Sequence, residues 1–132
     1  MSHQAELEMQ VNDLDCLDKA CTEVGAKLVL DQKFYKTYGN VKEKCDHAIT
    51  VPGNTKALEI GVLKISTNPE AYQLKTDFFM GGYGLETVVG TDACKLNQAY
   101  MAAVFEKNVP FGWTVSRAMQ QDGQLVLEAE RM

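Results

Sequence analysis

The chain has 132 residues, enough for one domain that buries about two-thirds of its unfolded surface without a disulfide or metal staple. With 45% hydrophobic and 23% charged residues it has a globular composition, and its apolar runs are far shorter than the roughly 18 residues of a membrane-spanning helix. The net charge of −5 opposes binding to nucleic acid or anionic lipid, because both reward clustered Lys and Arg. We therefore expect residues 1–132 to form a single soluble domain without a membrane or nucleic-acid partner.

The N-terminus and the cysteines both favour an intracellular location. Residues 1–6 contain neither a basic nor an apolar region, so we expect no secretory signal and place the chain in the cytosol. The four cysteines show no C-x-x-C spacing, which argues against a disulfide framework and favours reduced thiols. They are Cys16, Cys21, Cys45 and Cys94.

The first 30 residues predict a strand, a helix and a second strand. Apolar and polar residues alternate over 4–11, as expected for a half-buried strand. An Asn-Asp pair then offers a cap to a helix over 13–24, and Gly25 suits the C-terminal end of that helix. Residues 26–30 are typical of a short strand.

The middle of the chain predicts an antiparallel meander. Residues 31–46 show no clear period, which indicates an edge strand or an ordered loop. Strand-like runs follow over 48–51, 58–62 and 71–79, and turn clusters such as Pro52-Gly53-Asn54 separate them.

The segment 91–107 has the strongest helical periodicity in the chain and predicts a core-facing helix. Thr91 is its expected N-cap, since the hydroxyl can accept a hydrogen bond from an orphan backbone N–H. One broad apolar arc includes Asn97, and we expect this amide to be buried with hydrogen-bond partners. The arc consists of Ala93, Leu96, Asn97, Tyr100, Met101, Val104 and Phe105, and the opposite side carries Lys95, Gln98, Ala102 and Glu106.

Two strand-like runs over 112–118 and 125–130 predict a C-terminal hairpin. Asp122-Gly123 lies between them, a pair typical of a type I′ turn because both residues tolerate positive φ. We expect Trp113 to anchor the hairpin against the helices, whereas an exposed tryptophan would mark a partner surface. The predicted order is β-α-β-β-β-β-α-β-β, which favours an α+β two-layer sandwich with two helices on one face of an antiparallel sheet.

Seven short motifs follow one another along nearly the whole chain. They are Met1-Ser2-His3, Leu14/Leu17/Ala20 with Val24-Gly25, Tyr38-Gly39, Glu59-Ile60-Gly61, Tyr72 to Asp77, Gln98-Ala99-Tyr100 and Asp122-Gly123-x-Leu125-Val126-Leu127. In their order and spacing they resemble the plastid hypothetical reading frame thirty-five family, a domain of unknown function found in cyanobacteria, red-algal plastids, other bacteria and phages. The resemblance implies a bacterial cytosolic, stromal or infected-host location and supplies no catalytic residues. Residues 78–84, with the sequence Phe-Phe-Met-Gly-Gly-Tyr-Gly, depart from the family pattern, in which tryptophan or a bulky residue is expected after Asp77.

A glycine-rich turn and a lysine/tyrosine segment provide the candidate ligand-binding residues. Residues 81–84 stand between a strand and a helix, where backbone amides can bind phosphate, although no nucleotide fingerprint is present. The structural alternative is a turn that needs positive φ. Lysines and aromatics interleave over 33–44, a mixture that stacks bases and holds phosphates, or one that forms a solvated edge strand. The selected residues are Lys33, Tyr35, Lys36, Tyr38, Asp77, Gly81, Gly82, Tyr83 and Gly84.

Structural roles explain the cysteines and histidines more simply than metal binding or a reactive thiol. Cys45 and His47 could supply two zinc ligands together with His3, but the spacing does not require a metal, and we expect neither a metal nor a cofactor. Cys94 lies near the start of the predicted helix, where the thiol pKa could be lowered. We favour a small buried hydrophobic role for it.

Three functional hypotheses follow. The first is a small non-enzymatic accessory or binding protein that acts through a protein-interaction surface, including a homo-oligomer formed through an edge strand. The second is a module that binds a nucleotide or another phosphorylated compound between the glycine turn and the lysine/tyrosine segment, which in a phage could sequester a host signal. The third is an enzyme that uses Asp77 or Cys94. Asp77 and Glu59 have no identifiable catalytic partner, and solvent-facing strand charges are the ordinary explanation for both.

Overall fold

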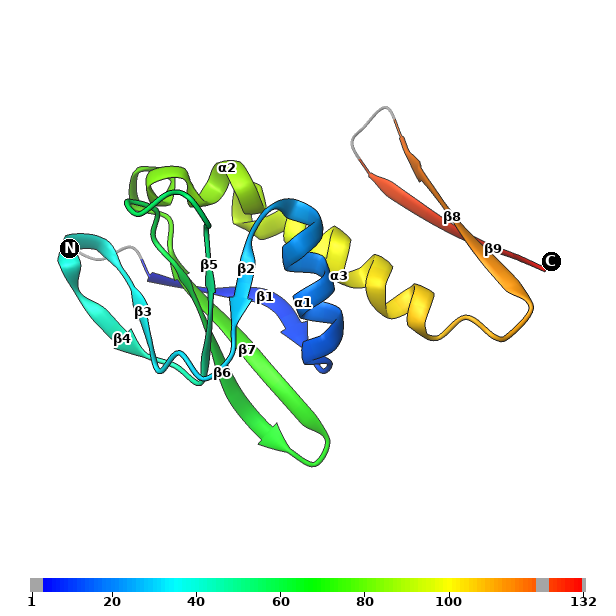
Figure 1. Cartoon of the computed structure of the whole chain (residues 1–132), viewed down its shortest axis with the longest axis horizontal. Coiled ribbons are helices and arrows are strands. Elements are labelled where there is room, and N and C mark those ends of the chain that lie inside the picture. Colours follow the sequence, from blue (N-terminus) through cyan, green and yellow to red (C-terminus); the bar gives the residue numbers. More distant parts are fainter. Residues whose placement is uncertain (1–3, 121–123, 132) are drawn as a thin grey trace.

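A computed structural model describes residues 4–120 and 124–131 and shows the expected α+β architecture. Its main sheet is antiparallel and has the strand order β1-β7-β6-β5-β2 (Figure 1). The predicted meander is present as the consecutive strands β5, β6 and β7. The five strands are β1 (Gln4–Val11), β2 (Lys27–Val29), β5 (His47–Thr50), β6 (Ile60–Thr67) and β7 (Glu70–Asp77).

Helices α1 (Leu14–Val24) and α3 (Cys94–Lys107) share one apolar core with a face of this sheet. The α1 signals are confirmed: the Asp13 side chain accepts a hydrogen bond from the Cys16 backbone N–H at 3.1 Å, and Gly25 ends the helix with φ of 93°. Along β6, Ile60 and Val62 belong to the core beneath the helices. None of the helices in the described ranges is long and apolar enough to cross a membrane.

The start of α3 was predicted incorrectly. Helix α3 begins at Cys94 rather than Thr91, and residue 93 precedes it in a left-handed conformation without a side-chain cap. Residues 91–93 form a 3-10 turn, because Gly90 with φ of 89° turns the chain sharply after the short helix α2 (Leu85–Val89). Helix α2 was not expected from the amino-acid sequence. It follows a six-residue 3-10 segment, Phe79–Gly84, in which five consecutive residues from 80 to 84 have positive φ.

The buried face of α3 is also rotated relative to the expectation. Its buried residues are Leu96, Ala99, Tyr100, Ala102 and Ala103. Asn97 is exposed, so the predicted buried amide is wrong, and Met101 is 58% exposed. Only part of the broad apolar arc therefore faces the main core.

Residues 31–46 contain a small separate ribbon formed by β3 (Phe34–Lys36) and β4 (Lys42–Lys44), with a 3-10 turn, Tyr38–Asn40, between them. Tyr35 is 1% exposed and packs against Gly61 of β6, in a small cluster with Cys45 and Ala48. The ribbon thus covers part of the sheet face opposite the helices. The alternation of side chains in β6 makes this arrangement possible, because Gly61 points away from Ile60 and Val62.

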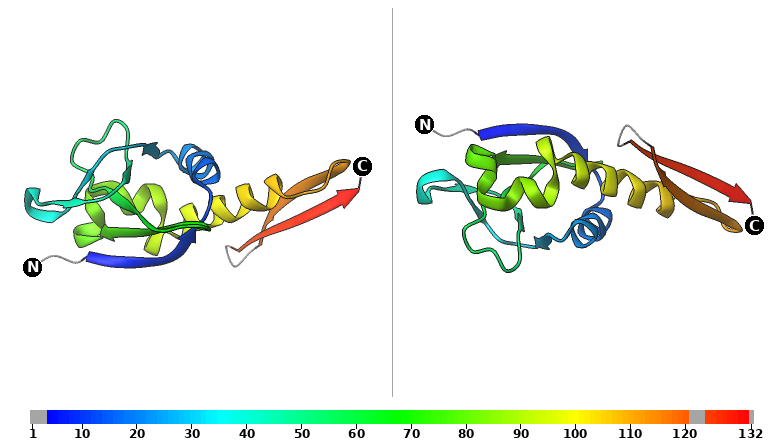
Figure 2. Two further views of the ribbon diagram at one scale, coloured as in Figure 1. Left: turned by 90° about the horizontal axis from the view of Figure 1, so that it is seen from below. Right: turned by 90° about the horizontal axis from the view of Figure 1, so that it is seen from above.

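The C-terminal hairpin is confirmed, with β8 (Trp113–Met119) paired antiparallel to β9 (Leu125–Arg131). It does not join the main sheet. It forms its own two-stranded sheet and lies at the far end of the molecule, reached through α3 (Figures 1 and 2). Residues 121–123 lie outside the described residues, so the turn type remains a prediction. The Gln120 backbone N–H donates to the Gln124 carbonyl at 2.8 Å and closes the ribbon.

Candidate functional site

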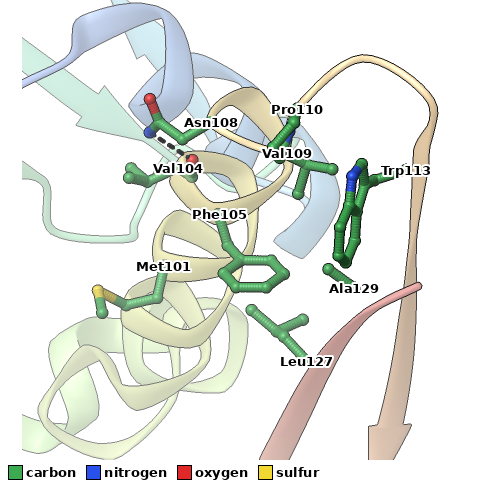
Figure 3. A pocket seen from close by; sticks show the side chains of 9 residues that line it. All are labelled: Met101, Val104, Phe105, Asn108, Val109, Pro110, Trp113, Leu127 and Ala129. Atoms are coloured by element: carbon green, nitrogen blue, oxygen red, sulfur yellow. Dashed lines mark hydrogen bonds between the residues drawn. The ribbon is translucent and has the colours of Figure 1, made fainter. Parts of the chain in front are cut away.

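An apolar groove separates the second half of α3 from the hairpin (Figure 3). Its volume is about 500 Å³. Asn108 provides the one polar side chain among its lining residues, and this amide donates to the Val104 carbonyl at 2.8 Å. The lining residues are Met101, Val104, Phe105, Asn108, Val109, Pro110, Trp113, Leu127 and Ala129.

The helix wall of the groove is the outer part of the apolar arc, where Val104 still packs against the main core. Met101 and Phe105 are 58% and 37% exposed, and Val104 is half-buried. These residues are spaced by three and four positions, so they share one side of the helix. Figure 3 shows Phe105 directed into the space between the helix and the hairpin, toward Leu127.

The strand register determines which residues of the hairpin face the groove. Trp113 pairs with Arg131, Val115 with Ala129, and Arg117 with Leu127. Directly opposed residues lie on the same face of a ribbon, so the apolar members of these pairs face α3 together. The other face of the ribbon carries Thr114, Ser116, Glu128 and Glu130.

Arg117 holds the hairpin to the body of the protein. Its guanidinium contacts the Glu106 carboxylate, with Nη2 at 2.6 Å and Nε at 2.8 Å from Oε1, and it also pairs with Glu23. Hydrogen bonds to Glu23 and Glu106 raise the pKa of Arg117. Burial acts to raise the pKa of Glu106, but hydrogen bonds from Arg117 and Lys19 outweigh it and lower this pKa. These ion pairs form a charged clamp that links β8 to α1 and α3.

Two aromatic residues are open to solvent at the groove: Trp113 in its lining and Phe111 in the adjoining loop. Trp113 is 41% exposed, so the expectation that it would be buried against the helices is wrong. Phe111 is fully exposed in the loop between α3 and β8. The sequence signal for this surface was the Phe-Gly-Trp run after the helix. It was missed because a periodic apolar arc does not reveal how much of the arc a neighbouring element covers.

The structure brings together some, but not all, of the residues selected as ligand contacts. Lys36, Tyr38 and Tyr83 line one hollow of about 390 Å³, which Lys56 also lines. Close to this hollow the Tyr38 and Phe79 rings lie 4.2 Å apart between centroids, and the Leu58 backbone N–H donates to the Gly82 carbonyl at 2.8 Å. The expected proximity of the glycine turn and the lysine/tyrosine segment is thus observed.

The remaining selected residues take part in packing, ion pairs, hydrogen bonds or tight turns. Tyr35 is buried under the ribbon, and Lys33 lies 3.7 Å from the Asp31 carboxylate. Asp77 is fully buried, so the explanation of a solvent-facing strand charge is wrong for this residue. Its two oxygens accept hydrogen bonds from the Tyr38 and Phe79 backbone N–H groups at 3.1 and 2.9 Å, which satisfy the buried carboxylate. Gly81, Gly82 and Gly84 have φ values of 68°, 66° and 112°, which supports the alternative of a turn that needs positive φ.

The other chemistry-bearing side chains are separated or already bonded. Glu59 accepts a hydrogen bond from the Lys36 backbone N–H at 2.9 Å. The Cys45 thiol donates to the Gln32 carbonyl, and His47 Nδ1 accepts from the Asp31 backbone N–H. Within residues 4–120 and 124–131, no three His, Cys, Asp or Glu side chains gather as metal ligands; His3 lies outside these ranges.

The thiols differ in exposure. Cys94 is exposed at the start of α3, which corrects the expectation of a buried hydrophobic role. Cys21 is buried, and burial raises its pKa to about 12. Burial likewise raises the pKa of Cys45 to about 11, so both thiols stay protonated near neutral pH.

Comparisons with known proteins found no relative of this chain. No protein-family model, curated protein or solved structure matches this chain.

Proposed function

We propose that this protein is a small non-enzymatic accessory protein that binds a protein partner through the groove between α3 and the hairpin. The observation that carries the proposal is the open apolar groove itself, of about 500 Å³, with the exposed Trp113 in its lining and the exposed Phe111 directly after the lining residue Pro110. A contiguous apolar patch of this kind typically marks an interaction site on a soluble domain.

The composition of the groove supports a protein partner. Phe, Trp and Met are enriched where proteins bind proteins, and aromatic anchors dominate the energy of such interfaces. Phe105, Trp113 and Met101 supply these residue types around one concave surface. The charged clamp at Arg117 holds the hairpin wall in place, so a partner would meet a largely preformed groove.

The hydrogen bonds of two carboxylates, the buried Asp77 and the half-buried Glu59, also favour a non-enzymatic role. Both oxygens of Asp77 hold backbone N–H groups, and Glu59 holds the backbone of the β3–β4 ribbon. These bonds give both side chains a structural role that requires no substrate.

A matched pair of substitutions tests the proposal. Met101 and Leu30 are each 58% exposed, but Leu30 does not line the groove. Tagged wild-type protein, Met101→Glu and Leu30→Glu would be used to capture partners from the natural host, with quantitative mass spectrometry as the readout. We expect Met101→Glu to lose the captured protein and Leu30→Glu to keep it. Equal capture by both variants would overturn the proposal.

A second candidate function is the binding of a nucleotide or another phosphorylated compound in the hollow beside Tyr38 and Tyr83. The observation that favours it is the presence of Lys36 and Lys56 around the same hollow as two partly exposed aromatic rings. Lysine ammonium groups can bind phosphate and tyrosine rings can stack on a base.

Calorimetric titration with adenosine triphosphate tests this second candidate. The double variant Lys36→Glu and Lys56→Glu should lose at least tenfold in affinity, because two favourable charges become repulsive. The control is Lys33→Glu with Lys44→Glu, which changes the same charge outside the hollow. Equal affinities in the two double variants, or no binding by the wild type, would rule the hollow out.

A further inference from the structure

The β8–β9 hairpin presents an unpaired strand edge next to the apolar groove. The two strands pair with each other, and within the described residues no other strand pairs with either of them. A two-stranded ribbon is marginally stable alone in water, and its free edges are templates for further pairing. The hairpin therefore has backbone groups to satisfy as well as apolar surface to cover.

The direction of the free backbone groups follows from the closing hydrogen bond. The Gln120 backbone N–H donates to the Gln124 carbonyl, and hydrogen-bonded pairs alternate along an antiparallel ladder. Ser116 consequently bonds inward to β9, while Val115 and Arg117 direct their backbone N–H and C=O groups outward from β8. A strand added at this edge would bond to these two residues.

We propose that the occupant of this surface is a second copy of the chain, with β8 of one copy pairing antiparallel with β8 of the other. This inference rests on the proposed function, namely that the groove and hairpin bind protein. The pairing is two-fold symmetric and centred on Ser116, and it extends the two hairpins into one four-stranded sheet. Such a self-complementary contact is the commonest form of homodimer.

The β8 sequence is compatible with this register. Pairing centred on Ser116 sets Trp113 against Met119, Thr114 against Ala118 and Val115 against Arg117 of the second copy. No like charges are opposed. Val115 of one copy and Arg117 of the other then form a hydrogen-bonded pair. This agrees with the hairpin, in which the backbone groups of both residues point away from β9.

Other strand edges are less suitable for self-pairing. The register that pairs all of β9 with its copy sets Glu128 directly against Glu128, and like charges directly opposed destabilise a strand pair. On β1, the long edge of the main sheet, central registers oppose Glu6 to Glu8 or Glu8 to Glu8. The choice of β8 thus follows from charge as well as from backbone direction.

The symmetry also places the apolar faces together. A two-fold axis perpendicular to the sheet keeps the groove-facing side of both hairpins on one face, so the two grooves lie beneath a single sheet. Met101, Phe105, Phe111 and Trp113 together expose about 500 Å² per copy, if each side chain offers roughly 150–250 Å² when fully exposed. If the dimer covers all of this surface, it buries about 1,000 Å² in total, the lower limit for a specific interface. We therefore expect a weak dimer whose formation depends on protein concentration.

Disulfide trapping tests the register directly. Ser116 lies at the dyad in a non-hydrogen-bonded pair, which brings the two Cβ atoms to about 4.5–5.5 Å. Thr114 lies on the same exposed face, but the register separates it from its own copy by about 13 Å. The test variants are Ser116→Cys and Thr114→Cys, each with Cys94→Ser to remove the exposed native thiol. Mild oxidation should cross-link the Ser116→Cys variant into a covalent dimer and leave the Thr114→Cys variant monomeric.

Sedimentation equilibrium of the wild type supplies the second measurement. A concentration-dependent monomer–dimer equilibrium together with selective cross-linking at position 116 is the expected result. A monomer at all concentrations, or a dimer with equal cross-linking of the two variants, would overturn the β8 pairing. If the wild type is monomeric while Met101→Glu still loses a captured host protein, the second-copy inference fails and the proposed function stands. If Met101→Glu has no effect on capture, the proposed function fails independently.

Discussion

The contact between Gly61 and Tyr35 allows a quantitative test of how the β3–β4 ribbon is attached. A Cβ atom added to Gly61 would lie 2.5 Å from Tyr35 Cε1 and 3.0 Å from Cγ, and closer still to Cδ1. Real Cβ atoms do not approach other atoms this closely, so the tyrosine ring or strand β6 must move. Neither moves freely, because Tyr35 is 1% exposed and Gly61 lies in a central strand paired with Ala48 on one side and Lys75 on the other.

The expected cost of Gly61→Ala follows from overpacking. Insertion of a methyl group into a packed site costs typically about 1–3 kcal/mol, and the loss of unfolded-chain entropy returns about 0.4–1 kcal/mol. Gly61 has ordinary strand φ, so no backbone strain contributes. We expect a net loss of about 2 kcal/mol in the free energy of unfolding. Removal of the ring by Tyr35→Ala should itself cost about 3–5 kcal/mol. In that background, however, Gly61→Ala should be neutral or stabilising by up to about 1 kcal/mol.

Urea unfolding followed by far-ultraviolet circular dichroism measures all four proteins of this double-mutant cycle. Unchanged slopes of free energy against urea would show that the unfolded states are comparable. The reasoning requires a coupling energy of about 2–3 kcal/mol between the two positions. It would be refuted if Gly61→Ala cost the same with and without the tyrosine ring, or if it cost less than about 0.5 kcal/mol in the wild type.

Three further predictions concern charge and thiols. Asp13→Asn should keep the α1 cap but lose the charged hydrogen bond with Lys107, which is the principal cause of the lowered Asp13 pKa. The stability deficit of this variant at neutral pH should therefore disappear as the pH falls below 3.8, and a deficit that stays constant with pH in urea unfolding would contradict this. Arg117→Gln should change global stability by less than about 1 kcal/mol but accelerate amide hydrogen exchange in β8 and β9, and unchanged exchange would show that the clamp is dispensable. Iodoacetamide should modify only Cys94 of the four cysteines in the folded protein, as intact-mass spectrometry would show, whereas modification of Cys21 at a similar rate would contradict its burial.

Local signals account for the elements that the sequence predicted correctly. The alternation in β1 and the Asp13 and Gly25 signals at the ends of α1 act between residues a few positions apart, so they are readable without knowledge of the fold. The hairpin pairing of β8 with β9 is similarly local, since its strands are joined by a short turn. From these elements and the meander, the α+β class followed.

Local signals did not determine the start of α3 or the ribbon. Thr91 has the chemistry of an N-cap, but Gly90 and the left-handed residue 93 turn the chain so that the helix begins three residues later. The β3–β4 ribbon depends on the absence of a side chain at Gly61, a residue far away in sequence that leaves room for Tyr35. Secondary-structure propensity cannot reveal such a contact, because a propensity describes the residues of one segment at a time.

The broad apolar arc of α3 and the hairpin that follows it can be read from the amino-acid sequence. Which part of the arc is buried depends on the packing of α3 against α1 and the sheet. Small side chains on α3, including Ala99 and Ala103, pack in the same core as Ala20 of α1, and small residues allow two helices to approach closely. The larger Met101 and Phe105 are left on the outer side, where the hairpin covers them only partly. The candidate site exists because the arc is wider than the surface that α1 and the sheet can cover.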